Sequence, residues 1–456
     1  MTIFQKLSTI WEEDSLLRRV VRNSSFLFGS NVFASGLSFL QGIVIIRLIG
    51  VANLGMVVVI QTFASNINRL LSFRMSEVVV KRLVPALADG KKVEAAALVK
   101  AAGLTEAAVS LLACLALVLL TPWAARIFAH DASSEPWFIF YGLILLINLV
   151  YETSTGILQA THRFSNLARF TMIQAVITFS IIGVTYILYR WVAMQSLALY
   201  LVPAVLLAYV VGKAYYNISL VRLAMREINT TLGTGWWRIS LEKLTGKRAL
   251  VLFALNTNLN GTVNLVFRDN IPLYLGMLLS TTQVGYFAIA FTLISTITLA
   301  LDPFIAPTFS EISHTIATLQ WGTTLRLLRR VTALASGIVL AIAGFWALTG
   351  WWLIPFVYKS QARPAYPLLL ILLVGYGFSG IFQWNRSVML SLGKAGYPVL
   401  ILVLTGVIEL GLIFALVPRY GYLMMGGILS GYFIFSTGFI SLRGLWEVRL
   451  RQLAAT

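Results

Sequence analysis

The stretch SFLFGSNVFASGLSFLQGIVII occupies residues 25–46 and contains no charged side chain. A helix of about 20 apolar residues crosses roughly 30 Å of hydrocarbon, so this stretch predicts a membrane-spanning helix. It is too long for the apolar core of a signal peptide and lacks a convincing small-residue cleavage site. We therefore interpret it as a retained first span.

Further apolar runs of similar length predict an all-α polytopic membrane protein of about twelve transmembrane helices. The composition agrees, because 58% of the residues are hydrophobic and 11% are charged, with a mean hydropathy of +0.84. A soluble globular domain carries far more charge. The predicted spans cover 25–46, 53–74, 102–122, 137–159, 166–189, 195–214, 248–268, 283–306, 331–350, 367–390, 396–417 and 424–442.

The net charge of +18 indicates orientation in the membrane. With a cytoplasmic N-terminus, one side of the predicted membrane collects most lysines and arginines, including Arg163 and Lys394, and the other side has few, such as Arg126 and Lys359. By the positive-inside rule, an even number of spans then places both termini in the cytoplasm. The excess charge is mostly a topology signal, so no nucleic-acid partner is expected.

Metal, redox and nucleotide chemistry find no support in the residue pattern. Cys114 is the only cysteine, the three histidines are scattered, and we find no phosphate-binding glycine loop. We therefore expect no cofactor, no metal site and no catalytic residue. The longest outer connection, 121–136, has only Asp131 and Glu135 as acids, which argues against a membrane-embedded polymerase or glycosyltransferase.

The polar stretch 215–247 predicts a cytoplasmic linker between two six-helix lobes, 25–214 and 248–442. An N-terminal segment at the cytoplasmic membrane surface, 1–24, and a cytoplasmic tail, 443–456, complete the expected organisation.

The two lobes share a weak internal repeat. Leu48–Gly55 resembles Leu278–Gly285 at an offset of 230 residues, and Leu158–His162 loosely aligns with Leu390–Lys394 at an offset of 232. Two separate segments with nearly one offset predict a duplicated unit, the arrangement in which transporters form a site between repeats.

Four short motifs carry a family resemblance: Arg47–Gly50 with Gly55, Leu158–Phe164, Val284–Tyr286, and Pro303–Pro307 with Phe309 and Ser310. With them, nearly the whole chain resembles the polysaccharide-biosynthesis or O-antigen flippases, whose superfamily also contains multidrug and toxin extrusion transporters and lipid II flippases. Twelve rather than fourteen spans looks more like the oligosaccharide flippases. The resemblance implies two six-helix lobes around a central cavity and alternating access on an undecaprenyl-diphosphate-linked sugar.

A polar line on the seventh span, at i, i+4, i+8 and i+12, comprises Asn256, Asn260, Asn264 and Arg268. It covers about 18 Å of one helix face, and we interpret it as lining a substrate cavity. Hydrogen bonding between helices is the structural alternative.

Similar lines occur on the second span, at Gln61, Ser65, Asn68 and Ser72, and on the tenth, at Tyr376, Ser379, Gln383 and Arg386. Arg69 and Arg74 lie beside the first of these. An arginine suits a diphosphate because its planar fork donates paired hydrogen bonds to oxyanions. Snorkelling to the interface is the alternative for Arg74 and Arg386, and pairing with Asp269 is the alternative for Arg268.

Acids in apolar spans are candidates for ion coupling to a proton or sodium gradient. Glu152 and Asp302 are the two candidates, and a carboxyl in either place responds to burial and to nearby charge. The alternative is an ion pair with an arginine on another helix, which we favour for Glu409.

The sequence therefore predicts a transporter rather than an enzyme. We expect a multi-pass flippase of the bacterial inner membrane that moves an undecaprenyl-diphosphate-linked oligosaccharide for O-antigen, capsule or exopolysaccharide. Membrane lipids, polysaccharide polymerase and glycosyltransferases are the expected partners. A small-molecule or multidrug antiporter of the same superfamily is the alternative, although a cationic substrate favours carboxylates over arginines and amides.

Overall fold

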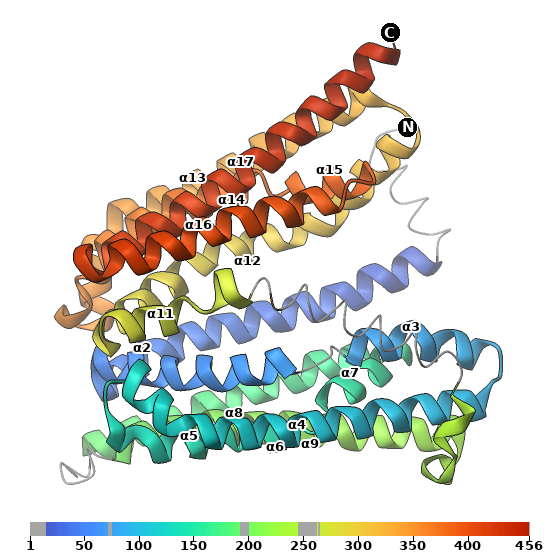
Figure 1. Ribbon diagram of the computed structural model, residues 1–456, viewed down its shortest axis with the longest axis horizontal. Coiled ribbons are helices and arrows are strands. Elements are labelled where there is room, and N and C mark those ends of the chain that lie inside the picture. Colours follow the sequence, from blue (N-terminus) through green and yellow to red (C-terminus); the bar gives the residue numbers. More distant parts are fainter. Residues whose placement is uncertain (1–14, 72–74, 192–199, 245–261, 263–264, 456) are drawn as a thin grey trace. The chain divides into compact units, whose positions relative to one another are not determined.

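The computed structural model describes residues 15–71, 75–191, 200–244, 262 and 265–455, and every regular element in these ranges is a helix. The first α-helices are α2 (Ser15–Leu71), α3 (Met75–Ala88), α4 (Lys92–Phe128), α5 (Glu135–Gly142), α6 (Ile144–Ile147), α7 (Tyr151–Ala160), α8 (Phe164–Trp191) and α9 (Leu201–Leu232). After them come α11 (Ile271–Leu278), α12 (Thr281–Ala317), α13 (Trp321–Tyr358), α14 (Ala365–Ile381), α15 (Asn385–Ser391), α16 (Gly396–Tyr420) and α17 (Tyr422–Ala455), as Figure 1 shows.

Ten helices in the described part of the chain are long and apolar enough to cross a membrane. The first, Phe26–Leu70, contains Gly50, whose φ of 79° and ψ of 175° interrupt the helix. It therefore holds the two spans predicted over 25–46 and 53–74. The predicted seventh span, 248–268, lies largely outside the described residues. The all-helical polytopic fold is confirmed, and the number twelve stays a prediction.

Residue contacts divide the chain into two compact units that are described separately. The first unit comprises Met1–Val44, Ala64–Pro122 and Glu135–Thr262, and the second comprises Ile45–Phe63, Trp123–Ser134 and Val263–Thr456. The second unit thus takes in a segment of α2, so this division does not follow a single cut at the linker. The lobe bounds expected from the sequence stay a prediction.

The predicted linker begins inside a helix. Residues 215–232 continue α9, and two short 3₁₀ turns follow at Trp236–Arg238 and Leu241–Lys243. The indole Nε1 of Trp236 donates to Oδ1 of Asn229 at 3.0 Å, which ties this turn to the end of α9. Of the N-terminal segment, residues 15–24 are helical and 1–14 lie outside the described residues.

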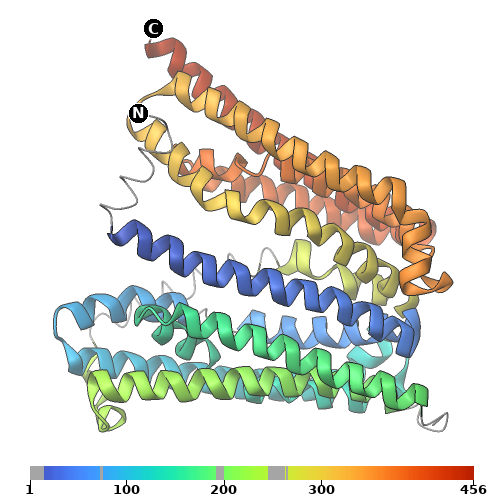
Figure 2. The ribbon, with the colours of Figure 1, turned by 180° about the vertical axis from the view of Figure 1, so that it is seen from behind.

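The core of the first unit is built from α3, α4, α7 and α9. Leu83, Leu98, Leu158 and Leu220 each contribute a fully buried side chain to one apolar cluster. Figure 2 shows α8 and α9 side by side, and their contacts confirm this pairing. In the second unit, α14 packs on α12, α13 and α17, and Trp384 is the largest of its fully buried side chains.

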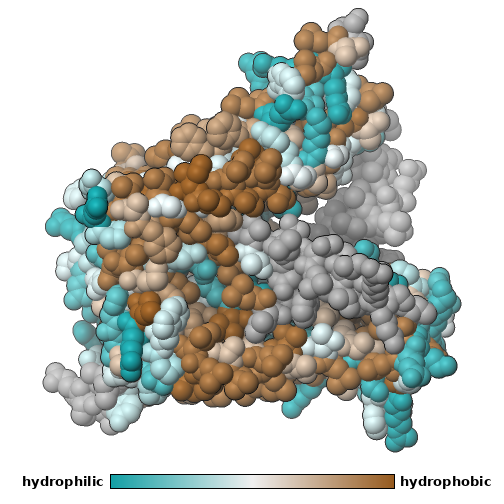
Figure 3. All heavy atoms as spheres, in the orientation of Figure 1, coloured by the Kyte–Doolittle hydropathy of each residue, from teal (hydrophilic) through white to brown (hydrophobic). Residues whose placement is uncertain are grey.

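The apolar outer surface is what membrane-spanning helices require. On α16, Leu400, Leu404, Val407 and Ile408 each expose more than half of the side chain, and Figure 3 shows apolar side chains gathered over this helix. In water such a surface would cost free energy, whereas lipid chains solvate it.

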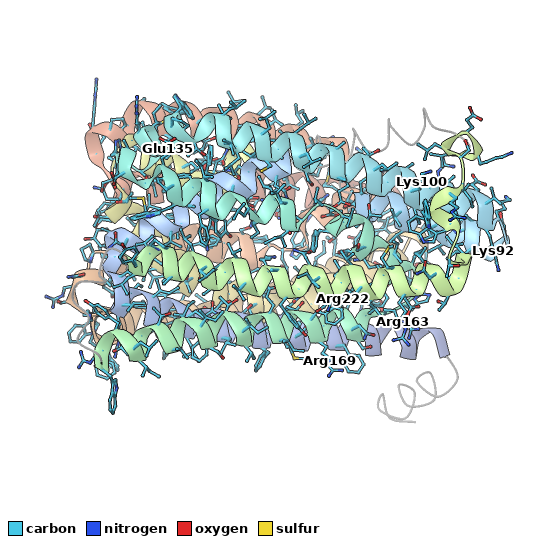
Figure 4. All side chains as sticks on the ribbon, turned by 90° about the horizontal axis from the view of Figure 1, so that it is seen from below. Lys92, Lys100, Glu135, Arg163, Arg169 and Arg222 are labelled. Atoms are coloured by element: carbon cyan, nitrogen blue, oxygen red, sulfur yellow. The ribbon has the colours of Figure 1, made fainter. Side chains whose placement is uncertain are left out.

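Basic side chains of the first unit gather toward one end of its helices. Figure 4 shows Lys92, Lys100, Arg163 and Arg222 toward this end and Glu135 toward the other. The sequence placed these four basic residues on one side of the membrane, and the structure agrees. That this side faces the cytoplasm stays a prediction.

An internal repeat is visible in local geometry. After α7, His162 has a φ of 58° and the amide of Arg163 donates to the carbonyl of Leu158 at 2.8 Å. After α15, Gly393 has a φ of 74° and the amide of Lys394 donates to the carbonyl of Met389 at 2.9 Å. The two helix ends therefore match at an offset of 231, one residue less than the sequence alignment of this segment predicted.

Ion pairs repeat at the same two places. Arg163 pairs with Glu227 on α9 at 2.9 Å, and Lys394 pairs with Glu447 on α17 at 2.5 Å. In each unit a basic residue after the fourth helix of the repeat thus binds an acid on its sixth. The duplicated unit predicted from short motifs is consequently present in the structure.

Candidate functional site

The candidate site in the first unit lies where a membrane-spanning helix breaks. Within the candidate span Ala132–Ala160, α6 ends at Ile147 and α7 begins at Tyr151. The N-cap residue Val150 has a φ of −138° and a ψ of 31° and offers no side-chain cap. The first amides of α7 therefore need acceptors from elsewhere, since no water is available inside hydrocarbon.

Glu106, on α4, supplies these acceptors. Its Oε1 accepts from the amide of Glu152 at 2.6 Å and its Oε2 from the amide of Thr153 at 2.8 Å. The Glu106 residue is 7% exposed. A carboxylate at a helix N-terminus also interacts favourably with the helix dipole, so Glu106 stabilises the broken helix in two ways. Sequence reasoning did not single out Glu106, although the criterion that selected Glu152, a lone acid in an apolar run, applies to it.

Glu152 repeats this arrangement one helix further on. Its Oε2 accepts from the Ser76 amide at 3.3 Å and from the Ser76 hydroxyl. Ser76 is the second residue of α3, so Glu152 binds the N-terminus of that helix. The partner of Glu152 is thus a serine and a helix end rather than the arginine that was the alternative interpretation.

Polar side chains surround the two carboxyl groups. Nδ2 of Asn217 on α9 donates to Oδ1 of Asn148 at 2.6 Å, directly at the helix break. A small cavity is lined by Asn68, Glu106, Ser110, Asn148, Tyr151 and Glu152, among others. Asn68 belongs to the polar line predicted on the second span, so the structure brings that line to the broken helix. Discontinuous helices with polar linings are typical of transporter ion and substrate sites.

The second unit has a break at the matching place but no carboxyl group in the corresponding contacts. In it α14 ends at Ile381 and α15 begins at Asn385. Nε1 of Trp384 donates to the Thr332 hydroxyl at 2.8 Å, and the Thr437 hydroxyl donates to that of Ser379 at 3.4 Å. The two halves thus share architecture and differ in charge.

A second candidate site centres on Arg268 in the second unit. Arg268 lies in a π-helical segment, Leu265–Asp269, and such segments are frequent at functional sites. Its guanidinium carbon lies 5.3 Å from the ring centroid of Phe433, and Arg268 also interacts with the Tyr376 hydroxyl. The Tyr376 and Phe433 rings are 4.3 Å apart. Arg268 is nevertheless exposed, so an anion can reach it.

The other predicted site residues are placed as follows. Asn256, Asn260, Asn264 and Arg74 lie outside the described residues. Arg69, in the last turn of α2, and Arg386 and Asp302 are exposed. Gln383 is half-buried, and its Oε1 has no hydrogen-bond partner. Among the residues that the structure describes, no group of three or more His, Cys, Asp or Glu side chains could hold a metal ion.

Comparison with protein families identifies a match to the model described as polysaccharide biosynthesis protein, over residues 20–313. A curated relative, the inner membrane protein YghQ of Escherichia coli, is 26% identical over 158 residues. This second match spans 35% of the chain and 44% of the relative.

Solved structures of two transporter classes are similar in fold. An inward-facing multidrug resistance transporter of the MATE family has a TM-score of 0.68 at 14% identity, with 92% of this chain and 96% of that chain covered. The lipid II flippase MurJ in an inward closed conformation has a TM-score of 0.67 at 12% identity, with 94% and 93% covered. These likenesses and the family match confirm the resemblance inferred from the sequence motifs.

Proposed function

Because the chain belongs to the polysaccharide biosynthesis protein family, we propose that it moves an undecaprenyl-diphosphate-linked oligosaccharide across the bacterial inner membrane. The cargo would be a repeat unit of O-antigen, capsule or exopolysaccharide, delivered by glycosyltransferases and passed to a polysaccharide polymerase. Alternating access between the two membrane faces would carry it across. The YghQ relative, an inner membrane protein, supports this location.

The observation that carries this proposal is the exposed Arg268 packed on Phe433. A ring contacts the face of a guanidinium, whereas phosphate oxygens bind its edge, so both contacts can form together. The ring also limits the orientations that the guanidinium adopts, which lowers the entropy cost of binding. A diphosphate is the part of the cargo common to all these glycolipids, and Arg268 is suited to it.

Arg69 is the second proposed head-group ligand, because it is exposed at the end of the second span. Asn256, Asn260, Asn264, Gln383, Arg386 and Arg74 are the remaining proposed substrate contacts. We propose a proton or sodium gradient as the energy source, with Glu152 and Asp302 as the coupling residues. Glu152 suits this role because it joins two helix ends, whose contact then depends on the state of one carboxyl group.

Deletion of the gene, followed by complementation, tests this function. Wild-type protein should restore surface glycan, whereas Arg268→Ala and Arg69→Ala should not, at equal abundance in the membrane. Arg329→Ala is the matched control, since Arg329 is an exposed arginine of α13 outside the proposed site. Normal glycan display in the deletion strain, or full rescue by both variants, would contradict the proposal.

The fold likeness to a multidrug resistance transporter keeps a small-molecule antiporter as the second candidate. A deletion strain with intact glycan and raised sensitivity to organic cations would favour this candidate over the flippase.

A further inference from the structure

Helices α16 and α17 enclose a groove of about 610 Å³ in the second unit. Its walls are mostly apolar and include Ile408, Leu412, Leu416, Ile428, Phe435 and Phe439. The volume lies in the range of roughly 300–1,000 Å³ that is typical of small-molecule sites. The groove lies apart from Arg268 in its lining, because Arg268 is not among the residues that form it.

The groove is left open by two glycines of α17. Gly427 and Gly431 both line it, and a Cβ added to either would meet no atom within 4 Å. At its rim Ile408 is 63% exposed and Phe435 is 61% exposed. The groove therefore opens on the apolar outer surface that faces lipid, and an apolar molecule can enter it from the membrane.

A single acid, Glu409, lines this apolar groove. The Glu409 residue is only 2% exposed, and neither carboxyl oxygen has a hydrogen-bond partner. The ion pair with an arginine that we favoured from the sequence does not form within the described residues, because Arg268 packs on Phe433 instead. A buried carboxyl group without a partner is costly, and the groove is the open space beside it.

The chemistry of the lining selects the ligand. A cation can pair with Glu409 and also interact with the aromatic faces of Tyr432, Phe435 and Phe439. A lipid tail or a neutral molecule without a donor would leave the carboxyl unsatisfied, and an anion would be repelled by the carboxylate. We propose that this groove binds a lipophilic monovalent organic cation, with its charge at Glu409 and its apolar groups against Phe435 and Phe439. This site goes beyond glycolipid transport and does not depend on it.

Equilibrium binding of tetraphenylphosphonium to the full chain in lipid nanodiscs tests this site. We expect saturable binding with one site per chain. Tetraphenylborate, which has the same shape and the opposite charge, should bind at least tenfold more weakly. Glu409→Gln should weaken tetraphenylphosphonium binding at least tenfold, because it removes the negative charge and keeps the side-chain size.

A second variant keeps Glu409 and fills the groove. Gly431→Leu places a side chain in the open space and should also weaken tetraphenylphosphonium binding at least tenfold. Gly411→Leu on α16 is the matched control, since a Cβ there also meets no atom within 4 Å and Gly411 does not line the groove. Because Gly431→Leu leaves the acid intact, it tests the site even where Glu409→Gln does not fold.

Three results would overturn the proposal. They are unchanged binding in both Glu409→Gln and Gly431→Leu, equal binding of tetraphenylborate, and uptake that rises with lipid without saturation. The last result would mean that the probe only partitions into the bilayer.

Discussion

Gly55 and Gly285, which lie 230 residues apart in the chain, approach so closely that a Cβ on Gly55 would come within 2.8 Å of the Gly285 amide nitrogen. The contact is reciprocal. A Cβ on Gly55 would also overlap the carbonyl of Thr281, and a Cβ on Gly285 would overlap the carbonyl of Val51. Val51 and Thr281 are themselves 230 residues apart, so the repeated motif packs against its own copy within the second unit.

This contact predicts that alanine is not tolerated at either glycine. Gly55→Ala or Gly285→Ala should each destabilise the protein by about 1–3 kcal/mol, because a backbone carbonyl cannot move aside as a flexible side chain can. Thermal unfolding in detergent measures the effect. Gly36→Ala, on the same helix as Gly55, has open space around its Cβ and should unfold like wild type. Equal unfolding temperatures for all three variants would contradict the packing.

Much of the fold could be predicted because its causes are local. Apolar runs of sufficient length indicate spans, and the Gly55 and Gly285 motifs point to the repeat. The helix break before Tyr151 could not be predicted in this way. The sequence stays apolar through Leu149 and Val150, and the acceptors that stabilise the break come from Glu106 on another helix.

Glu106 is predicted to stabilise the first unit through this break. Glu106→Ala would strand the amides of Glu152 and Thr153, at about 1–3 kcal/mol each. Both amides should lose protection from hydrogen exchange, and the unfolding temperature should fall. Glu311→Ala, at an exposed acid of α12, should change neither quantity. Unaltered protection of both amides in Glu106→Ala would show that they have another acceptor.

Glu152 is predicted to couple transport to a pH gradient. Glu152→Gln keeps an oxygen that can accept from Ser76, so the variant should fold and bind substrate, but it cannot exchange a proton. Transport in reconstituted vesicles should then ignore an imposed pH gradient. Asp302→Asn in the same assay tests the other candidate. Wild-type pH dependence of Glu152→Gln would assign Glu152 a purely structural role as the cap of α3.

The membrane orientation is predicted from charge. In a Cys114→Ala background, Thr234→Cys in the predicted linker should react with an impermeant maleimide only after spheroplasts are opened. Ala132→Cys, in the predicted outer connection, should react in intact spheroplasts. Both positions are exposed. The opposite labelling pattern would invert the topology.

The candidate site was less predictable than the fold because ligands come from several helices. Arg268 was identified through its place in a polar line, and its aromatic partners Tyr376 and Phe433 come from α14 and α17. No local pattern links these three positions. The unpaired state of Glu409 likewise depends on which neighbours fold around it, which sequence spacing does not reveal.

The most direct test of the proposed transport is movement of a fluorescent polyprenyl-diphosphate-linked sugar across the bilayer of vesicles that contain the purified protein. The probe starts in the inner leaflet, and an impermeant quencher detects its arrival outside. Wild type and Arg329→Ala should raise the rate at least tenfold over protein-free vesicles, whereas Arg268→Ala should not, and a fluorescent phospholipid should stay in place. Equal rates for wild-type, Arg268→Ala and protein-free vesicles would contradict the flippase function.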